Sequence, residues 1–184
     1  MYTTQTNVEQ ALGRTLTTDE AAHLTSVLLP GITAYINQKT NTLFGSDDEV
    51  EIVVSGCGSS RLIIPTMWEV SSVELDGSPV DSASWKKYPS TGPYLALTKI
   101  DGIWAEGQDN YVVKGKLGYQ TVSSDITSVA TQMAVTAFSS KKENGASIKS
   151  EKVGDYSVTY GIDEGAASSS LIILNNYNRL SRSI

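Results

Sequence analysis

The side chains best suited to acid–base or nucleophilic chemistry are few in this sequence. The only histidine, His23, stands between Ala22 and Leu24 in a helical pattern, where a lone histidine usually fills space. Cys57 lies in the string Gly-Cys-Gly-Ser-Ser at residues 56–60, and a nucleophile there would need a base and an orienting group. The sequence offers neither nearby. We therefore interpret the string as a loop and Cys57 as a small, buried apolar residue.

Metal and nucleotide sites have equally little support. A cluster of carboxylates could hold a hard cation, but it lacks the alternating ligands and central glycine of an EF-hand loop, so we interpret it as solvated. A single cysteine excludes an intrachain disulfide, and no phosphate-binding glycine motif occurs. We expect no catalytic residue, no metal and no cofactor, and hence no enzyme. A hydrolase with paired carboxylates stays an alternative that no motif supports. The clustered carboxylates are Asp47, Asp48, Glu49 and Glu51.

Charge is distributed unevenly along the 184 residues, whose formal net charge is −6. The excess of carboxylates lies mainly in residues 1–60, and after Glu164 the only charged side chains are Arg179 and Arg182. An acidic protein is poorly suited to grip duplex DNA, which requires clustered Lys and Arg. Neither a signal-peptide pattern nor a run of about eighteen apolar residues occurs, so we expect cytoplasmic synthesis and no membrane association.

The clearest helical pattern near the N-terminus covers residues 18–40. Thr17 and Glu20 have capping-box spacing, and apolar residues then recur at three- and four-residue steps. Pro30 lacks the backbone donor that a helix interior needs. We therefore expect a kink or a break at residues 28–31.

Two other helical patterns flank this one. A short pattern at residues 7–12 is ended by Gly13. A longer one at residues 124–142 begins at a Ser-Asp pair, and its apolar stripe contains small residues that permit close packing. The stripe consists of Ile126, Val129, Ala130, Met133, Ala134, Ala137 and Phe138.

Between residues 45 and 120 the sequence changes to short β-favouring runs separated by Gly, Pro, Asp and Ser. A turn is predicted at Asp76-Gly77, and the three tryptophans are expected to pack the sheet or its cover. The region is therefore predicted to be a small antiparallel sheet. The runs are residues 51–54, 61–64, 70–75, 84–88, 94–99 and 110–117, and the tryptophans are Trp68, Trp85 and Trp104.

A β-hairpin is predicted at residues 148–161. A Gly-Asp pair can turn the chain back at residues 153–155, and apolar or aromatic residues then alternate with polar ones. Such a hairpin presents one face to a partner. The side chains that we expect at this interface are Lys149, Glu151, Asp155, Tyr156 and Tyr160.

The C-terminal part consists of a small-residue hinge at residues 161–170 and a last amphipathic segment. Its apolar stripe recurs at helical spacing. A short helix behind a hinge cannot bury such a stripe alone, so we expect a docking partner from its own chain or from another. The stripe is Ile173, Leu174, Tyr177 and Leu180.

Together these patterns predict an α+β fold. It has a small helical body of about three to four helices, an inserted antiparallel β-region, a β-hairpin and a hinged C-terminal helix or arm. The predicted main domain is residues 1–161, with a helical body at 7–44 and 124–142, the β insertion at 45–120 and the hairpin at 148–161, and residues 162–184 form the hinge and docking segment.

Several stretches, taken in order, match one known pattern. The most specific is Ile-Lys-Ser-Glu-Lys-Val-Gly-Asp-Tyr-Ser-Val-Thr-Tyr at residues 148–160. The others are the helical residues 18–44, the Gly-rich loop and Pro-ended strand at 56–65, the Val-rich strand and turn at 70–77, the Gly-Tyr junction into a helix at 113–126, and the closing helix at 173–180. In this order they resemble the head-to-tail connector, or adaptor, proteins of long-tailed bacteriophages.

The resemblance implies a structural virion protein. Members of that family form a ring, typically of about twelve copies, beneath the portal protein in the neck between head and tail. The ring extends the DNA channel, through which DNA passes without specific binding, and gives a platform for the stopper or tail-completion protein. By analogy, the C-terminal segment docks on the portal. The docking residues so implied are Ile173, Leu174, Tyr177, Arg179, Leu180 and Arg182.

Two other functions stay open. A tail-completion or stopper subunit of the same neck would share a small β-rich architecture but lack the hinged docking tail. A carbohydrate-binding β-module is suggested by the Ser- and Thr-rich strands and by the three tryptophans, which could form a sugar-stacking platform if they were exposed.

Overall fold

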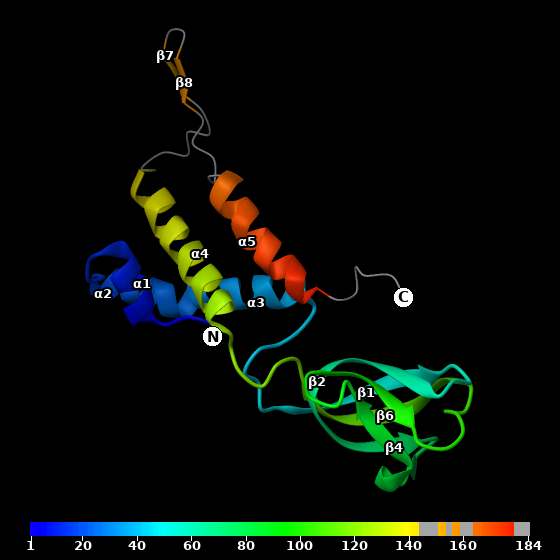
Figure 1. The fold of residues 1–184 in the computed structure, drawn as a ribbon. Coiled ribbons are helices and arrows are strands. Elements are labelled where there is room, and N and C mark those ends of the chain that lie inside the picture. The colour runs from blue at the N-terminus through cyan, green and yellow to red at the C-terminus, as the bar shows by residue number, and fades with distance from the viewer. Residues whose placement is uncertain (144–150, 154–155, 159–163, 179–184) are drawn as a thin grey trace. The chain divides into compact units, whose positions relative to one another are not determined.

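A computed structural model of the chain describes residues 1–143, 151–153, 156–158 and 164–178. These residues form two compact units (Figure 1). The helical unit combines Met1–Asn41 with Ser123–Ile184, and the β unit is Thr42–Val122. Helices and an antiparallel sheet thus occupy separate parts of the chain, and the predicted α+β class is confirmed.

In the helical unit, α4 packs against α1 and α3, and α5 packs against α3 and α4. Figure 1 shows α4 and α5 lying next to each other, with α4 crossing α3 and the C-terminal end of α5 reaching α3. The elements of this unit are α1 (Gln5–Leu12), α2 (Thr18–His23), η1 (Leu24–Leu28), α3 (Leu29–Thr40), α4 (Ser124–Glu143), β7 (Glu151–Val153), β8 (Tyr156–Val158) and α5 (Glu164–Tyr177).

The helical stretch predicted at residues 18–40 is present, but it is not regular throughout. Between α2 and α3 lies one π-helical turn, η1, in which the N–H of Leu29 donates to the carbonyl oxygen of Leu24. Pro30 follows at the start of α3, where it has no N–H to donate. The wider turn relieves the clash between the proline ring and the preceding turn, so the expected interruption occurs about one turn before the proline.

A compact apolar core joins α1, the α2–α3 stretch and α4. Of the predicted α4 stripe, five residues are buried, whereas Met133 and Ala137 are half-buried. The stripe therefore faces the other helices as its spacing predicted. The buried members of this core are Val8, Leu16, Leu24, Leu29, Ala134 and Phe138.

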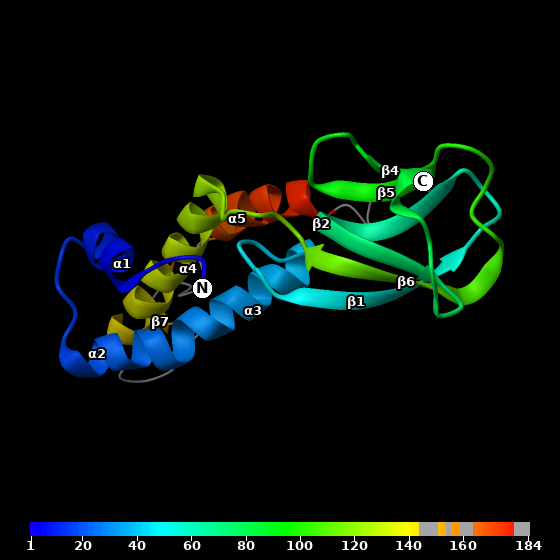
Figure 2. The ribbon, with the colours of Figure 1, turned by 90° about the horizontal axis from the view of Figure 1, so that it is seen from below.

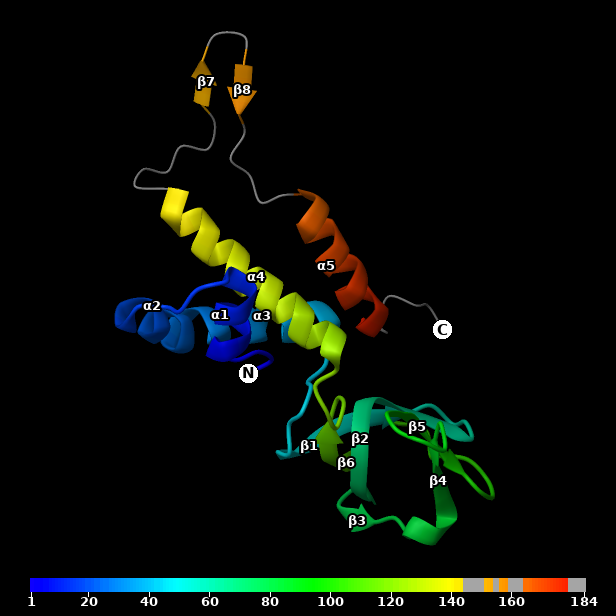
Figure 3. The same cartoon turned by 60° about the vertical axis from the view of Figure 1, so that its left-hand side comes forward.

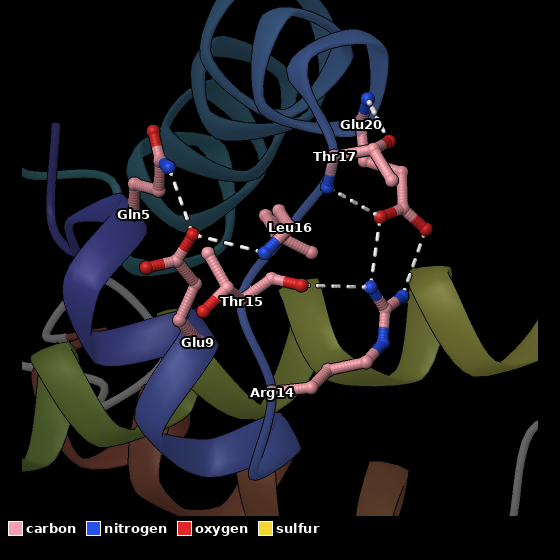
Figure 4. A network of polar contacts seen from close by, with 7 residues as sticks. All are labelled: Gln5, Glu9, Arg14, Thr15, Leu16, Thr17 and Glu20. Atoms are coloured by element: carbon pink, nitrogen blue, oxygen red, sulfur yellow. Dashed lines mark hydrogen bonds and ion pairs between the residues drawn. The ribbon is translucent and has the colours of Figure 1, made fainter.

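The connection from α1 to α2 is held by a polar network (Figure 4). Thr17 and Glu20 form the predicted capping box, since the Thr17 N–H donates to Glu20 Oε2 over 2.9 Å and the Glu20 N–H donates to Thr17 Oγ1 over 3.3 Å. Arg14 adds two parallel bonds of 2.8 Å to the Glu20 carboxylate. On the other side, the Leu16 N–H donates to Glu9 Oε1 over 3.0 Å. The carboxylates thereby fix the path of the chain into α2.

Acidification is expected to weaken this connection. The hydrogen bonds from Arg14 and from the backbone N–H of Thr17 lower the pKa of Glu20 from 4.5 to about 2. Because the pKa is lower in the folded state, the stabilisation is complete above about pH 4.5 and is lost as the pH falls towards 2. The helical circular dichroism of the E20Q variant should therefore depend less on pH in this window than that of the unchanged protein. Asp19→Asn, an exposed change in the same turn, is the control, and equal pH dependence of E20Q and the unchanged protein would contradict the assignment.

The β unit is one antiparallel sheet in the order β1, β6, β2, β5, β4, with the short β3 paired to β2. Figure 2 shows β1, β6 and β2 running next to one another. The strands are β1 (Glu49–Gly56), β2 (Arg61–Leu75), β3 (Ser78–Pro79), β4 (Trp85–Tyr88), β5 (Tyr94–Lys99) and β6 (Gly107–Leu117), with a 3₁₀ turn, η2 (Ser82–Ser84), before β4.

The long strand β2 replaces two predicted strands, at residues 61–64 and 70–75, so that prediction was wrong. Its first part pairs with β5 as far as Met67, and its second part pairs with β6 from Met67 onwards. Pro65 lies where the pairing with β5 is irregular, between Ile63 and Met67. A proline is tolerated there because its missing N–H is not needed for a regular ladder.

The sheet encloses an apolar core that includes two of the tryptophans. Trp104 is 0% exposed and donates its indole N–H to the carbonyl oxygen of Leu97 over 2.9 Å. Its ring meets that of Tyr111 edge to face, with centroids 5.4 Å apart. The core members are Leu62, Ile64, Met67, Val70, Val73, Trp85, Leu97, Trp104, Tyr111 and Val113.

The chain enters and leaves the β unit along two paired segments. Phe44 and Tyr119 form a parallel bridge, and their rings stack with centroids 5.2 Å apart. The Tyr119 N–H donates to Leu43 O over 2.9 Å, and the Gly45 N–H donates to Tyr119 O over 2.8 Å. The aromatic pair and these hydrogen bonds hold together the two segments by which the chain enters and leaves the base of the β unit.

Candidate interaction surfaces

The predicted docking stripe lies partly inside the chain's own helical unit. Leu174 is only 1% exposed and Ile173 is half-buried, because α5 packs against α3 and α4. The chain itself, one of the two partners that the sequence left open, therefore covers the centre of the stripe. Arg179, Leu180 and Arg182 lie outside the described residues. The helix α5 begins at Glu164, within the residues expected to form the hinge, and its two alanines, Ala166 and Ala167, are good helix formers.

Polar bonds hold the C-terminal end of α5 in place. The hydroxyl of Tyr177 donates to Asp125 Oδ2 over 2.7 Å and lies 2.9 Å from Ser123 Oγ. The amide of Asn178 donates to the carbonyl oxygen of Lys39 over 3.1 Å. Burial raises the pKa of Asp125, but hydrogen bonds from Ser123, Tyr177 and the backbone outweigh it, and the net pKa is lowered. This anchor ties α5 to the start of α4 and the end of α3.

Two apolar side chains of α5 that helical spacing did not select are exposed. Leu171 is 38% exposed and Ile172 is 62% exposed. Residues 171–174 are all apolar, and four consecutive residues point to all sides of a helix. Ile172 and Leu174 are about 200° apart around the helix axis, so Ile172 points outwards when Leu174 points into the unit. The run of four apolar residues was the available signal. These two side chains are candidates for contact with a partner.

The predicted hairpin is present in its two strands (Figure 3). The strands β7 and β8 pair antiparallel, with Glu151 opposite Val158 and Val153 opposite Tyr156. The turn expected at residues 153–155 includes residues outside the described part of the chain. Of the expected interface residues, Glu151 and Tyr156 lie in these strands, while Lys149, Asp155 and Tyr160 lie outside the described residues.

The outer face of the β1–β6–β2 sheet carries a ladder of charges. Its central strand, β6, contributes two lysines, and the flanking strands contribute carboxylates. The ammonium nitrogen of Lys114 lies 3.0 Å from Glu51 Oε1 and 3.2 Å from Glu74 Oε1. These hydrogen bonds raise the pKa of Lys114, and the bond to Glu51 contributes most. Such exposed pairs add little stability, but opposite charges on neighbouring strands favour this register over others.

A second lysine of β6 extends this ladder. Lys116 lies 3.2 Å from Glu69 and 3.8 Å from Asp47, and its ammonium group is 4.6 Å from the centre of the Trp68 ring. The acidic cluster predicted to be solvated therefore has Asp47 and Glu51 paired with lysines. Within the described residues, no group of three or more His, Cys, Asp or Glu side chains is placed to hold a metal ion.

The residues considered for nucleophilic chemistry, Cys57 and His23, lie in the β unit and the helical unit, respectively. Cys57 is exposed, so the prediction that it is buried was wrong. It stands in the loop between β1 and β2, and its sulfur lies 3.1 Å from Ser59 Oγ. His23 is half-buried at the end of α2. None of the described helices is both long and apolar enough to cross a lipid bilayer.

Comparison with known proteins gives a structural likeness only. No protein-family model matches the sequence, and no curated protein matches it. A chain in the neck of an empty gene transfer agent (GTA) particle, computed with C6 symmetry, has a TM-score of 0.60 and 13% identity over 97% of this chain and 89% of that chain.

Two other solved chains have a similar fold. One belongs to the virion of a native gene transfer agent particle, with a TM-score of 0.56 and 13% identity over 92% of this chain and 82% of that chain. The other belongs to the neck of a native GTA particle computed with C12 symmetry, with a TM-score of 0.55 and 12% identity over 98% of this chain and 92% of that chain. Nearly the whole chain therefore shares its fold with these particle proteins.

Proposed function

We propose that this protein is a structural subunit of the neck of a phage-like particle. In this proposal it is a connector that assembles as a ring beneath the portal, extends the DNA channel and offers a platform for a stopper or tail-completion protein. The observation that carries the proposal is the likeness to a chain of a gene transfer agent neck over 97% of this chain. The order of the sequence motifs, which resembles that of connector proteins, supports the same assignment.

The C-terminal segment is the proposed portal-binding element. Tyr177 and Asn178 anchor the end of α5, so the residues that follow start from a fixed point on the helical unit. These residues include Arg179 and Arg182, which suit an acidic surface on the portal. The exposed Leu171 and Ile172 supply apolar area on α5 itself, whereas Leu174 serves to hold the helix. The hairpin at residues 148–161 is proposed as a second contact with a neighbour.

Imaging of particles tests the function directly. Purified heads that carry the portal but lack the neck would be mixed with the protein and viewed at low resolution. We expect a ring of added density directly beneath the portal. Heads that remain unchanged, or density that appears only at tail tips, would contradict the connector assignment.

Removing residues 179–184 should weaken binding to such heads about tenfold, because two cations and two apolar side chains, Leu180 and Ile184, are lost from the segment. The helical circular dichroism should stay unchanged, since Leu174 and Tyr177 remain in place. A longer deletion, from residue 168, would also remove the buried Leu174 and is a poorer test. The double change of Arg179 and Arg182 to Lys keeps the charge and is the control. Normal binding by the shortened protein would exclude this segment from the portal contact.

The alternatives differ in their support. A stopper or tail-completion subunit would give density below an existing ring and would not bind bare heads, so the same images distinguish it. The carbohydrate-binding alternative loses its main support, because Trp85 and Trp104 are 7% and 0% exposed and cannot stack on a sugar.

A further inference from the structure

The sheet of the β unit has two edge strands that carry opposite charges. Within the part of the chain that the structure describes, β1 pairs only with β6 and β4 pairs only with β5. On its outer face β1 exposes Glu49, Glu51 and Val53, and β4 exposes Lys86 and Tyr88. An edge strand presents backbone donors and acceptors that another strand can bind.

The charges on each edge are only partly balanced within the chain. On β1, Glu51 shares Lys114 with Glu74, so a single ammonium group serves two carboxylates. On the β4 side, Lys86 is exposed and forms no salt bridge with any residue that the structure describes. The Arg61 guanidinium lies 4.2 Å from the centre of the Tyr88 ring and adds positive charge to this edge. One edge is therefore acidic and the other basic.

We infer that β1 of one copy pairs with β4 of the next copy, which extends the sheet from subunit to subunit. Pairing of β1 with β1, or of β4 with β4, would bring like charges together. Pairing of β1 with β4 brings opposite charges together and is head-to-tail, the kind of contact that generates a ring when the rotation closes. The inference rests on the ring assembly of the proposed function and names the surface that forms it.

The direction and register of this contact follow from the sheet itself. Four antiparallel pairings separate β1 from β4, so the two edge strands point the same way along the sheet. A small rotation about an axis along the strands keeps that direction and makes the contact parallel. In parallel pairing, Lys86 opposite Glu51 places Tyr88 opposite Val53, because both pairs are two residues apart. One register thus joins the opposite charges and the exposed apolar side chains.

Protection against aggregation is the simpler explanation for charged edges. Charge of either sign would serve that purpose, and an exposed apolar residue on each edge would work against it. Val53 is 55% exposed in the middle of the eight-residue β1, and Tyr88 is 45% exposed on β4. The combination of opposite signs with matching apolar positions favours a partner strand.

Disulfide cross-linking tests the contact in purified protein. All variants carry Cys57→Ser, because Cys57 is exposed and would react. The double variant Val53→Cys with Tyr88→Cys places the two sulfurs opposite each other in the parallel register, within bonding reach. After oxidation at the highest concentration that the protein tolerates, we expect a ladder of dimers, trimers and longer species. Each single-cysteine variant should stay monomeric.

The controls separate the alternatives. The first control is the double variant Glu49→Cys with Tyr88→Cys. Its two cysteines would face each other only if the strands paired antiparallel, so we expect no ladder from it. Dimers from either single variant, a ladder from this control, or no ladder from the first pair would overturn the inference. Since no heads are present, these outcomes are independent of portal binding. A ring seen on heads without any β1–β4 cross-link would leave the proposed function standing and remove this contact.

Charge reversal gives a second measurement. In the Val53→Cys, Tyr88→Cys protein, Glu51→Lys alone and Lys86→Glu alone should each lower the yield of the ladder about fivefold, because like charges then meet. The combined Glu51→Lys and Lys86→Glu protein should recover the yield. If the combined variant gives no higher yield of the ladder than either single variant, the two side chains do not meet.

Discussion

Replacing Leu174 by Ala is expected to destabilise the helical unit by about 2–5 kcal/mol. Leu174 is 1% exposed and lies where α5 meets α3 and α4, so its loss leaves a cavity that the three helices cannot easily close. Ile172→Ala is the matched control, because Ile172 is on the same helix but 62% exposed. This control should change the free energy of unfolding by no more than about 0.5 kcal/mol.

The measurement can address each unit separately. All three tryptophans lie in the β unit, whereas the α-helices lie in the helical unit. In urea, the helical circular dichroism of Leu174→Ala should fall at lower denaturant than in the unchanged protein, while the tryptophan fluorescence transition stays where it was. Equal stability of the Leu174 and Ile172 variants would mean that α5 is not docked through Leu174.

Features fixed by neighbouring residues could be predicted from the sequence. The capping box of Thr17 and Glu20 and the helix end at Gly13 occur in the structure because each needs only a few consecutive residues. Gly13 adopts φ 67°, a conformation that costs glycine little. The α4 stripe was equally accessible, since helical spacing alone decides which of its residues share a face.

Features that depend on distant partners could not be predicted. The sequence around Pro65 indicates two strands, and only the exchange of β5 for β6 as pairing partner explains why β2 continues through it. Cys57 resembles a core residue by type, but the loop after β1 places it outside. Amino-acid type is a weak guide where a tight turn decides which side chains face the core.

The candidate interaction surfaces were likewise only partly predictable from the sequence. Helical spacing selected Leu174 and Tyr177 correctly as one face of α5, but it could not say that α3 and α4 cover that face. The opposite charges of β1 and β4, at Glu51 and Lys86, can be read directly from the sequence. They become an interaction surface only when the strand order places both at edges of one sheet.

Replacing Gly118 by Ala is expected to destabilise the β unit by about 3 kcal/mol or more, through overpacking added to backbone strain. Gly118 has φ 82°, and a Cβ there would lie 1.8 Å from the carbonyl oxygen of Leu43. That oxygen accepts the N–H of Tyr119 in the paired segments at the base of the unit. The backbone must therefore move, and the bond to Leu43 must lengthen or break.

Gly102→Ala separates the two causes of this effect. Gly102 has φ 85°, but a Cβ added there would meet no atom within 4 Å, so the change should cost only the backbone strain, about 1–2 kcal/mol. The tryptophan fluorescence transition should thus shift further for Gly118→Ala than for Gly102→Ala, while the helical transition stays the same in both. Equal shifts would mean that the segments at residues 43 and 118 can separate without loss. In that case the Leu43–Tyr119 hydrogen bond would not be what holds the two segments together, and the Gly45–Tyr119 hydrogen bond and the Phe44–Tyr119 stack would remain to do so.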